Sequence, residues 1–306
     1  MIITKANATC EMTGDALNTS NGVGTPVNDV GDAGIGDACT YVPDTYQVEF
    51  YRMSLCTSNP DVAGAAEPDL SSCVDMLAET GETTQVNIVG TTETALDVPD
   101  FTIPPGTYPY MVTRLSSKLG IKHAFEASTA VAYGDNSGVT QAPGIYCWTV
   151  NNVLTGISNE NVMTPIGITI DAGATNRSNM QCSNTEADMS QAEFSYELIY
   201  VSNDNGCNSF DASDGDRAEL GNVGNGEGVS RFMQSATLSA TQCNNALSIL
   251  WTIDLTTPLV VTDTSNFVLN FRTTDAVSID FNGSASINPL IIKVGADPIQ
   301  AYLTTN

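Results

Sequence analysis

The chain has 306 residues, with 35 Asp plus Glu against 10 Lys plus Arg, and its formal charge at pH 7 is −25. A nucleic-acid-binding protein needs a cationic surface that displaces counterions from phosphates, so this composition excludes that class. Binding to anionic membrane surfaces is disfavoured for the same reason. Hydrophobic residues form 42% of the chain, which is enough for one large core or two smaller ones.

Neither a membrane span nor a secretory leader is visible in the sequence. No apolar stretch is as long as the roughly 18 residues that a spanning helix needs, so no span is predicted. The chain begins Met-Ile-Ile-Thr, without the apolar region and small-residue cleavage site of a leader. For a secreted protein we therefore expect either a leader that has been removed from a precursor or a different route of export.

Residues 1–45 are predicted to form an N-terminal extension. Ile2 and Ile3 make a short β-prone run, and residues 13–45 are rich in Gly, Asn, Asp and Thr, which predicts an irregular segment. The strand at Ile2 and Ile3 can complete the chain's own sheet or pair with an open edge of a second copy. Head-to-tail contacts of the second kind, if they do not close, build a filament.

The segment Tyr46–Leu55 predicts a strand whose apolar phase changes midway. Tyr46, Val48 and Phe50 face one way, and then Tyr51, Met53 and Leu55 take over the apolar positions. A β-bulge near Phe50 and Tyr51 brings both halves to one core. The alternative is a strand that is buried on both faces at its centre.

Period-two alternation recurs over the rest of the chain, which predicts half-buried strands. A single short helix is expected at residues 69–79, capped by Asp69. Residues 203–230 are predicted to be irregular, and the short link 273–275 predicts a hairpin between the strands on either side of it. The predicted strands are Ile166–Ile170, Phe194–Tyr200, Leu247–Leu255, Phe267–Phe271 and Val277–Phe281. Together they indicate an all-β protein, an antiparallel β-sandwich over residues 46–306, with an alternative boundary near residue 190.

The eight cysteines are widely spaced, and no two of them form a CxxC pair. Zinc ligation is therefore not expected, and an even number of cysteines favours disulfides formed in an oxidising compartment. Reduced, buried cysteines in a cytosolic protein are the alternative. Eight cysteines can pair in roughly a hundred ways, so the connectivity is not fixed by the sequence. Pairing of sequence neighbours would give Cys10–Cys39, Cys56–Cys73, Cys147–Cys182 and Cys207–Cys243.

A local basic cluster is the main candidate site. Arg114, Lys118, Lys122 and His123, the only histidine, lie within ten positions of one another. One interpretation is a sheet face whose charges keep an edge soluble. The other is a cationic patch that docks the acidic surface of another copy. His123 has no recognisable nucleophile near it, so we do not expect catalysis there.

Cofactor and metal sites are not expected. The acidic segment 211–219 misses the EF-hand register, which favours a solvated acidic loop over a calcium site, and segment 28–37 is interpreted in the same way. The glycine-rich segment 224–228 has no lysine for a phosphate loop. A sugar-stacking face is a further interpretation of the aromatic residues, although aromatic residues in alternating strands more often belong to the core. These residues are Tyr108, Tyr110, Tyr146, Trp148, Tyr196 and Trp251. Glycosylation sequons occur at Asn7, Asn18, Asn176 and Asn282.

Three segments carry a resemblance to a known group of proteins: Tyr46–Pro60, Pro68–Cys73 and Ile103–Met111. They resemble secreted, β-rich proteins of aquatic bacteria, some of which look like subunits of extracellular fibres with jelly-roll bodies. The resemblance covers about the first 115 residues. It implies a structural protein of the cell surface, joined to other copies of itself by strand exchange.

The sequence thus predicts a non-enzymatic, extracellular, homopolymeric subunit with a jelly-roll-like body. Ile2, Ile3, Arg114, Lys118 and Lys122 are its expected assembly residues. The main alternative is a secreted carbohydrate-binding or adhesin module that uses residues 203–230 and takes glycans as partners. A hydrolase with an unrecognised pair of carboxylates is the third hypothesis.

Overall fold

The structure is a computed structural model. It describes residues 10, 12–19, 36–62, 68–78, 84–89, 102–116, 118–131, 142–151, 153–155, 179–198, 217–222, 226–233, 248–265, 267–274, 276–281, 292–296 and 299–305. Several predictions lie outside the described residues, namely those on Ile2, Ile3, Asn7, Ile166–Ile170, Asn176, Cys207, Cys243 and Asn282.

The described chain is built almost entirely of β-strands, which confirms the all-β class. Its strands are β1 Met12–Thr13, β2 Ala16–Leu17, β3 Gly36–Tyr41, β4 Thr45–Cys56, β5 Cys73–Leu77, β6 Thr84–Val89, β7 Gly106–Ser116, β8 Lys118–Lys122, β9 Ala124–Val131, β10 Gly144–Thr149, β11 Val153–Thr155, β12 Met180–Ser183, β13 Ser195–Leu198, β14 Arg217–Asn222, β15 Gly226–Met233, β16 Ser248–Val261, β17 Phe267–Arg272, β18 Val277–Phe281, β19 Ile292–Ala296 and β20 Gln300–Thr305. Two short 3-10 helices, η1 Leu70–Ser72 and η3 Glu186–Gln191, are the helical elements of the described part.

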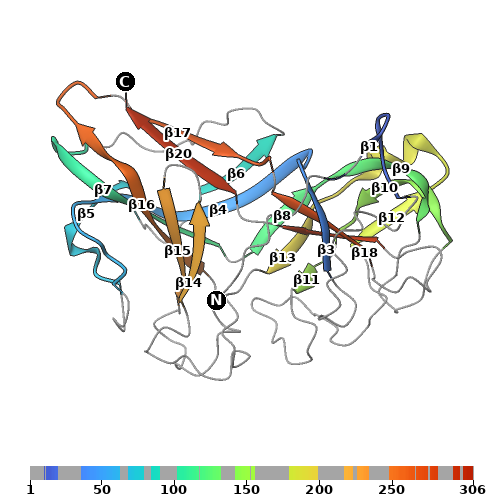
Figure 1. Ribbon diagram of the computed structural model, residues 1–306, viewed down its shortest axis with the longest axis horizontal. Coiled ribbons are helices and arrows are strands. Elements are labelled where there is room, and N and C mark those ends of the chain that lie inside the picture. Colours follow the sequence, from blue (N-terminus) through green and yellow to red (C-terminus); the bar gives the residue numbers. More distant parts are fainter. Residues whose placement is uncertain are drawn as a thin grey trace.

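The largest sheet has ten strands, and β4 lies at its centre (Figure 1). One edge of β4 pairs with β8 and then with β7, and the other edge pairs with β6 and then with β5. β16, β15 and β14 extend the sheet beyond β7, and β13 and β11 extend it beyond β8. β4 and the consecutive strands β7 and β8 therefore form a long spine that joins two wings of one sheet.

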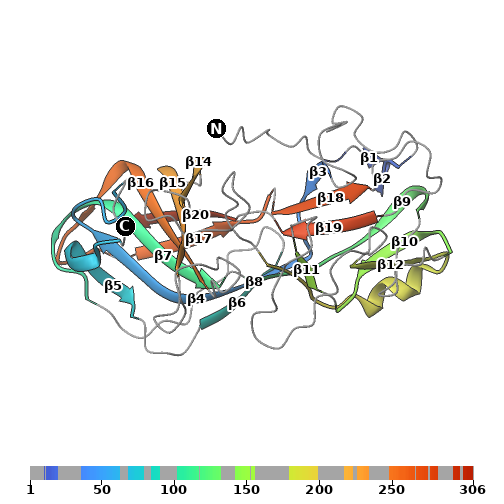
Figure 2. The same cartoon turned by 90° about the horizontal axis from the view of Figure 1, so that it is seen from below.

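A second layer covers part of this sheet. β17 pairs with β20, and the next strand along the chain, β18, pairs with β19 on one side and with β3 on the other. Figure 2 shows this second layer above the strip formed by β4 and β8. The rings of Phe50 and Phe271 stack between the two layers, with their centroids 5.1 Å apart. This packing fits a layered β-protein, whereas the jelly-roll strand order stays a prediction.

The remaining sheet, β1-β2-β9-β10-β12, lies at the end of the molecule opposite β5 (Figure 1). The chain reaches it without a linker, because β9 follows β8 after the single residue His123. Residues 118–131 thus run from the ten-stranded sheet into the five-stranded sheet.

The predicted bulge in β4 is confirmed. The register between β4 and β7 shifts between Phe50, which faces Leu115, and Arg52, which faces Arg114. Phe50 and Met53 are both buried, while Tyr51 between them is half-buried. The extra residue keeps the apolar side chains of both halves of the strand in one core.

The predicted hairpin across residues 273–275 is wrong. β17 and β18 do not pair with each other; they belong to two different sheets. Thr273 is completely buried, and its carbonyl accepts a hydrogen bond from the Ala276 backbone at 3.2 Å. A local turn therefore joins the two strands without reversing the chain. β17 pairs with β20, whereas β18 pairs with β19 and β3.

The predicted helix at 69–79 is also wrong, except at its start. Asp69 caps a single turn, since its carboxylate accepts from the Ser71 backbone at 2.9 Å. Cys73 then begins β5 and lies directly opposite Cys56, to which it is disulfide-bonded. The ladder to β4 and the covalent bond supply tertiary contacts that override local helical preference.

Both segments that were expected to be irregular contain strands. β3 lies within residues 13–45 and pairs with β18. β14 lies within residues 203–230 and pairs with β15, which begins in that segment and continues beyond it. The strand at residues 247–255 is confirmed as part of β16, but Leu250 and Thr252 are buried as well as Trp251. Leu250 packs with Cys56 and Val112 on the face opposite the main core.

Three disulfides are present in the described part: two join neighbouring strands of a sheet, and the third joins Cys10, which lies outside the strands, to β3. Cys56–Cys73 links β4 to β5, and Cys147–Cys182 links β10 to β12. Cys10–Cys39 fixes the N-terminal segment to β3. These three predicted pairs are confirmed, and disulfides of this kind are characteristic of proteins from oxidising, extracellular environments.

Candidate functional site

Arg114, Lys118 and Lys122 lie on one face of the sheet spine. They are four residues apart along β7 and β8, and the intervening Leu115 and Leu119 are buried in the main core. Because alternate residues of a strand share a face, the three cations occupy the face opposite that core. The structure therefore places these predicted assembly residues on a common face.

Arg114 is held by contacts on two neighbouring strands. Its Nε donates to Ser248 Oγ on β16 at 2.8 Å, and its guanidinium carbon lies 5.5 Å from the ring centroid of Tyr51 on β4. A cation over a tyrosine face is attracted by the ring quadrupole. Arg114 is thus oriented across the sheet rather than extended into solvent.

Lys118 has a similar aromatic contact further along the spine. Its Nζ lies 3.8 Å from the ring centroid of Tyr196. The Tyr196 ring in turn packs against Gly120. A Cβ at Gly120 would meet Tyr196 and Gln47 at 3.0 Å, so the missing side chain makes room for the ring. Burial and then the charge of Glu49 raise the pKa of the Tyr196 hydroxyl.

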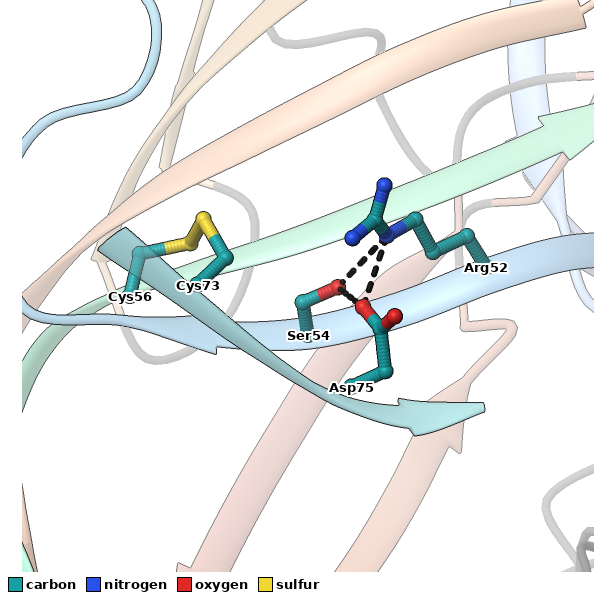
Figure 3. Close-up of polar contacts among 5 residues, drawn as sticks. All are labelled: Arg52, Ser54, Cys56, Cys73 and Asp75. Atoms are coloured by element: carbon teal, nitrogen blue, oxygen red, sulfur yellow. Dashed lines mark hydrogen bonds and ion pairs between the residues drawn. A yellow bond between two sulfur atoms is a disulfide. The ribbon is translucent and has the colours of Figure 1, made fainter. Parts of the chain in front are cut away.

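Arg52 adds a cation that the sequence did not single out. Its Nε donates to Asp75 Oδ1 at 2.7 Å and to Ser54 Oγ at 3.1 Å, and the Ser54 hydroxyl donates to the same carboxylate oxygen at 2.6 Å. Figure 3 shows this network next to the Cys56–Cys73 disulfide, with a terminal amino group of the guanidinium directed away from Asp75. Each of these contacts of Arg52 involves Nε, and the side chain is 21% exposed.

The strand register aligns Arg52 with further arginines. Arg52 lies opposite Arg114, Arg114 opposite Leu250, Leu250 opposite Arg231, and Arg231 opposite Arg217. We call this register line across β4, β7, β16, β15 and β14 the arginine row. It collects four of the ten basic residues of the chain. No sequence signal could reveal it, because these residues come together only through long-range pairing.

His123 does not belong to this exposed face. It is 1% exposed, its ring centroid lies 5.1 Å from that of Tyr41 and 5.6 Å from that of Phe125, and its backbone N–H donates to Thr149 Oγ1 at 3.1 Å. Its Nδ1 lies 3.5 Å from Asp44 Oδ2, while neither ring nitrogen has a hydrogen-bond partner within the described part of the chain. His123 is therefore a packing residue at the junction of the sheets.

We expect Asp44 to stabilise the fold less at low pH. Burial raises the pKa of its carboxyl group, but the contact with His123, the Ala124 backbone N–H and the charge of Lys122 together lower that pKa below its ordinary value. A carboxyl group whose pKa is lower in the folded state than in the unfolded state stabilises the fold at a pH above its unfolded-state pKa, about 4. This stabilisation disappears as the pH falls through the folded-state pKa. Urea unfolding between about pH 6 and pH 3 should show the gap between wild type and Asp44→Asn shrinking.

The charge-matched control for this prediction is Asp254→Asn, which removes an exposed carboxylate on β16. A stability difference between wild type and Asp44→Asn that stays constant over this pH range would contradict the prediction.

Three acidic residues lie on or beside the five-stranded sheet: Glu126 on β9, and Glu186 and Asp188 on η3. η3 follows β12 and contains Glu186 and Asp188 in its first turn. The charge of Glu126, then partial burial and the charge of Glu186 raise the pKa of the nearby Tyr146 hydroxyl. We call Glu126, Glu186 and Asp188 the acidic end. In Figure 2, β12 and the turn after it lie at one end of the long axis, and β5, which contacts Arg52, lies at the other.

Comparison with known proteins adds no assignment. No protein-family model matches the sequence, and no curated protein or solved structure is significantly similar to it.

The other predicted sites have varied outcomes. Among the described residues no group of His, Cys, Asp and Glu could hold a metal ion, and no helix is long and apolar enough to cross a membrane. Residues 211–216 and 223–225 of the acidic and glycine-rich segments lie outside the described residues, as do residues 28–35. Asn18 is half-buried. Of the aromatic residues, Tyr108, Trp148 and Trp251 are buried, whereas Tyr110, Tyr146 and Tyr196 are partly exposed.

Proposed function

We propose that this chain is a structural subunit of an extracellular filament at a bacterial cell surface, and that it assembles by exchange of its N-terminal strand. The anchoring of the N-terminal segment carries this proposal. Cys10 is disulfide-bonded to Cys39, and its backbone N–H donates to the Thr40 carbonyl at 2.9 Å. The residues before Cys10 therefore start from a fixed point beside β3.

An extended strand can pair with a neighbouring copy. Such a strand rises about 3.3 Å per residue, so residues 1–9 would span about 30 Å if extended. A strand edge of a second copy would offer main-chain hydrogen bonds to it. Within the described part of the chain, β17 and β20 form a two-stranded sheet.

The disulfides and the spine support a mechanical role. Strands β7, β8 and β9 carry the covalent chain along the molecule, and two of the three described disulfides tie the marginal strands β5 and β12 to their sheets. Cross-links that fasten sheet margins oppose peeling of those strands. A subunit that transmits tension between its neighbours benefits from both features.

The experiment compares Ile2→Ser/Ile3→Ser with wild type by negative-stain microscopy and sedimentation under non-reducing conditions. We expect filaments of wild type and monomers of the double variant, because the apolar side chains of the exchanged strand are lost. The matched control is Val62→Ser/Val260→Ser, which changes two side chains that are 54% and 58% exposed. It should polymerise like wild type.

Wild-type protein that stays monomeric under all tested conditions would overturn the proposal, as would unchanged polymerisation of Ile2→Ser/Ile3→Ser. Binding to immobilised glycans that depends on residues 203–230 would instead support the alternative of a carbohydrate-binding or adhesin module. Hydrolytic activity that is lost on replacing one pair of carboxylates would support an enzyme.

A further inference from the structure

We propose that the five-stranded sheet is a hinged unit, which Thr149 and Asn179 hold against the rest of the molecule, and that it opens before the fold as a whole unfolds. We call these two residues the latch. The inference goes beyond the proposed function, because it concerns a motion within one subunit and holds whether or not subunits exchange strands.

Four residues at which the chain enters or leaves the five-stranded sheet lie together. His123 joins β8 to β9, Thr149 ends β10, Asn179 directly precedes β12, and Glu193 lies between η3 and β13. The Thr149 backbone N–H donates to the His123 carbonyl, and the Thr149 carbonyl accepts from the Glu193 backbone N–H, both at 2.9 Å. The next residue, Val150, donates its N–H to the Asn179 carbonyl, also at 2.9 Å. Segments that are far apart in sequence therefore meet at one junction.

The Thr149 side chain adds two bonds to this junction. Thr149 is completely buried. Its hydroxyl accepts from the His123 backbone N–H at 3.1 Å and donates to the Glu193 carbonyl at 2.6 Å. One hydroxyl thus bonds the start of β9 to the segment that leads into β13 of the ten-stranded sheet. Its removal takes a hydrogen-bond partner from a donor and from an acceptor in two different segments.

Asn179 connects the unit to two other sheets. It is 2% exposed, and its side-chain amide donates to Ser195 Oγ on β13 at 2.9 Å and to the Val294 carbonyl on β19 at 2.6 Å. Its Oδ1 accepts from the Val294 backbone N–H at 3.0 Å. A single side chain therefore bonds the start of β12 to the ten-stranded sheet and to the three-stranded sheet β19-β18-β3.

The unit can stay intact when the latch opens. β10 pairs with β9 on one side and with β12 on the other, and Cys147–Cys182 joins β10 to β12 covalently. The latch consists of hydrogen bonds, and water satisfies the same groups once they are exposed. Contiguous units of this kind open at free energies below that of global unfolding.

The buried ring of His123 favours opening at the same place. His123 is 1% exposed, and neither ring nitrogen has a hydrogen-bond partner in the described part of the chain. A buried polar group without a hydrogen bond is a cost that contact with water relieves. In the filament proposed above, tension would therefore extend a subunit at this junction before it separates strands within a sheet.

The test is hydrogen exchange of the native full chain with its disulfides intact, measured by mass spectrometry at a series of low urea concentrations. In wild type, the amide protons of β9, β10 and β12 should exchange through one common opening. This opening should have a lower free energy and a weaker dependence on urea than the exchange of β4, β7 and β16, because it exposes less surface than global unfolding.

Thr149→Val removes the latch hydroxyl and keeps the shape of the side chain. It should speed exchange of β9, β10 and β12 by about ten-fold or more, because two hydrogen bonds of the closed state are lost. Asn179→Leu should speed exchange of the same strands. The matched control is Thr252→Val, since Thr252 is 4% exposed and its hydroxyl has no hydrogen-bond partner among the described residues. We expect this control to change exchange of β9, β10 and β12 by less than about two-fold.

Ile253→Val distinguishes a hinged unit from a uniformly cooperative fold. Ile253 is 1% exposed and lies on β16, in the core of the ten-stranded sheet. Its shortening should speed exchange of β4, β7 and β16 several-fold, because it lowers the stability of the whole fold. It should not speed exchange of β9, β10 and β12, because opening of the hinged unit leaves Ile253 packed.

Equal free energies and urea dependences for the two groups of strands in wild type would overturn the inference. So would acceleration of β9, β10 and β12 by Ile253→Val as large as that by Thr149→Val, or an effect of Thr252→Val equal to that of Thr149→Val. Circular dichroism shows whether each variant is folded. If Thr149→Val is not, wild type and Ile253→Val still decide between the two outcomes, and Thr149→Ser, which keeps the hydroxyl, should exchange like wild type.

Discussion

Phe50→Ala should lower the free energy of unfolding by about 3 to 5 kcal/mol, the range for removing a large aromatic side chain from a packed core. Phe50 is 1% exposed, and its ring stacks on Phe271 of β17. The substitution leaves a cavity between the ten-stranded sheet and the second layer, to which β17 belongs. Urea unfolding followed by tryptophan fluorescence measures the loss.

The control for Phe50→Ala is Val89→Ala, which shortens a side chain on the paired strand β6 that is 53% exposed. We expect a change of less than about 0.5 kcal/mol there. A double-mutant cycle with Phe271→Ala should give a coupling energy of about 0.5 to 1.5 kcal/mol, as for other aromatic pairs. Additive effects of the two substitutions would show that the two layers do not meet at these rings.

The bulge next to Phe50 illustrates what the sequence could predict. The phase change in β4 is a local pattern, and a single extra residue is its simplest physical solution, so both its existence and its place were predictable. The same holds for the strand character of β16, β17 and β18, and for the Asp69 cap. Each depends on residues within a few positions of one another.

The errors concern partners that are distant in the chain. The link between β17 and β18 is short enough for a hairpin, but their partners β20 and β19 lie further along the chain. The sequence of a link cannot exclude that later strands pair with the two strands it joins. β5 has helix-like spacing, yet it is a strand because it pairs with β4. The β3 segment has little apolar character and becomes ordered through β18 and the bond to Cys10.

The same distinction between local patterns and long-range contacts holds for the candidate site. Arg114, Lys118 and Lys122 could be predicted to share a face because four-residue spacing keeps the phase of a strand. The burial of His123 could not, since it depends on Tyr41 from another sheet. Arg52 could not be predicted as part of this site. It lies in an apolar strand just beyond the bulge, and only the register of the paired strands brings it next to Arg114 and Asp75.

The Cys10→Ser/Cys39→Ser variant should lose both stability and assembly. The Cys10–Cys39 bond closes a separation of 29 residues, so its removal should cost about 3 to 4 kcal/mol by the loop-entropy relation. It should also abolish filaments, because the exchanged strand no longer starts from a fixed point beside β3. Chemical denaturation and negative-stain microscopy, both without reductant, measure the two effects.

Cys56→Ser/Cys73→Ser is the control that separates these two effects. This bond closes 17 residues, so its loss should cost about 3 kcal/mol, nearly as much as the loss of Cys10–Cys39. It lies at the β4–β5 margin, far in sequence from the N-terminal segment, and its loss should leave filaments intact wherever the protein is folded. If both variants lose filaments equally, assembly depends on general stability, and the anchored N-terminal segment has no special role. If neither does, strand exchange does not require the anchor at β3.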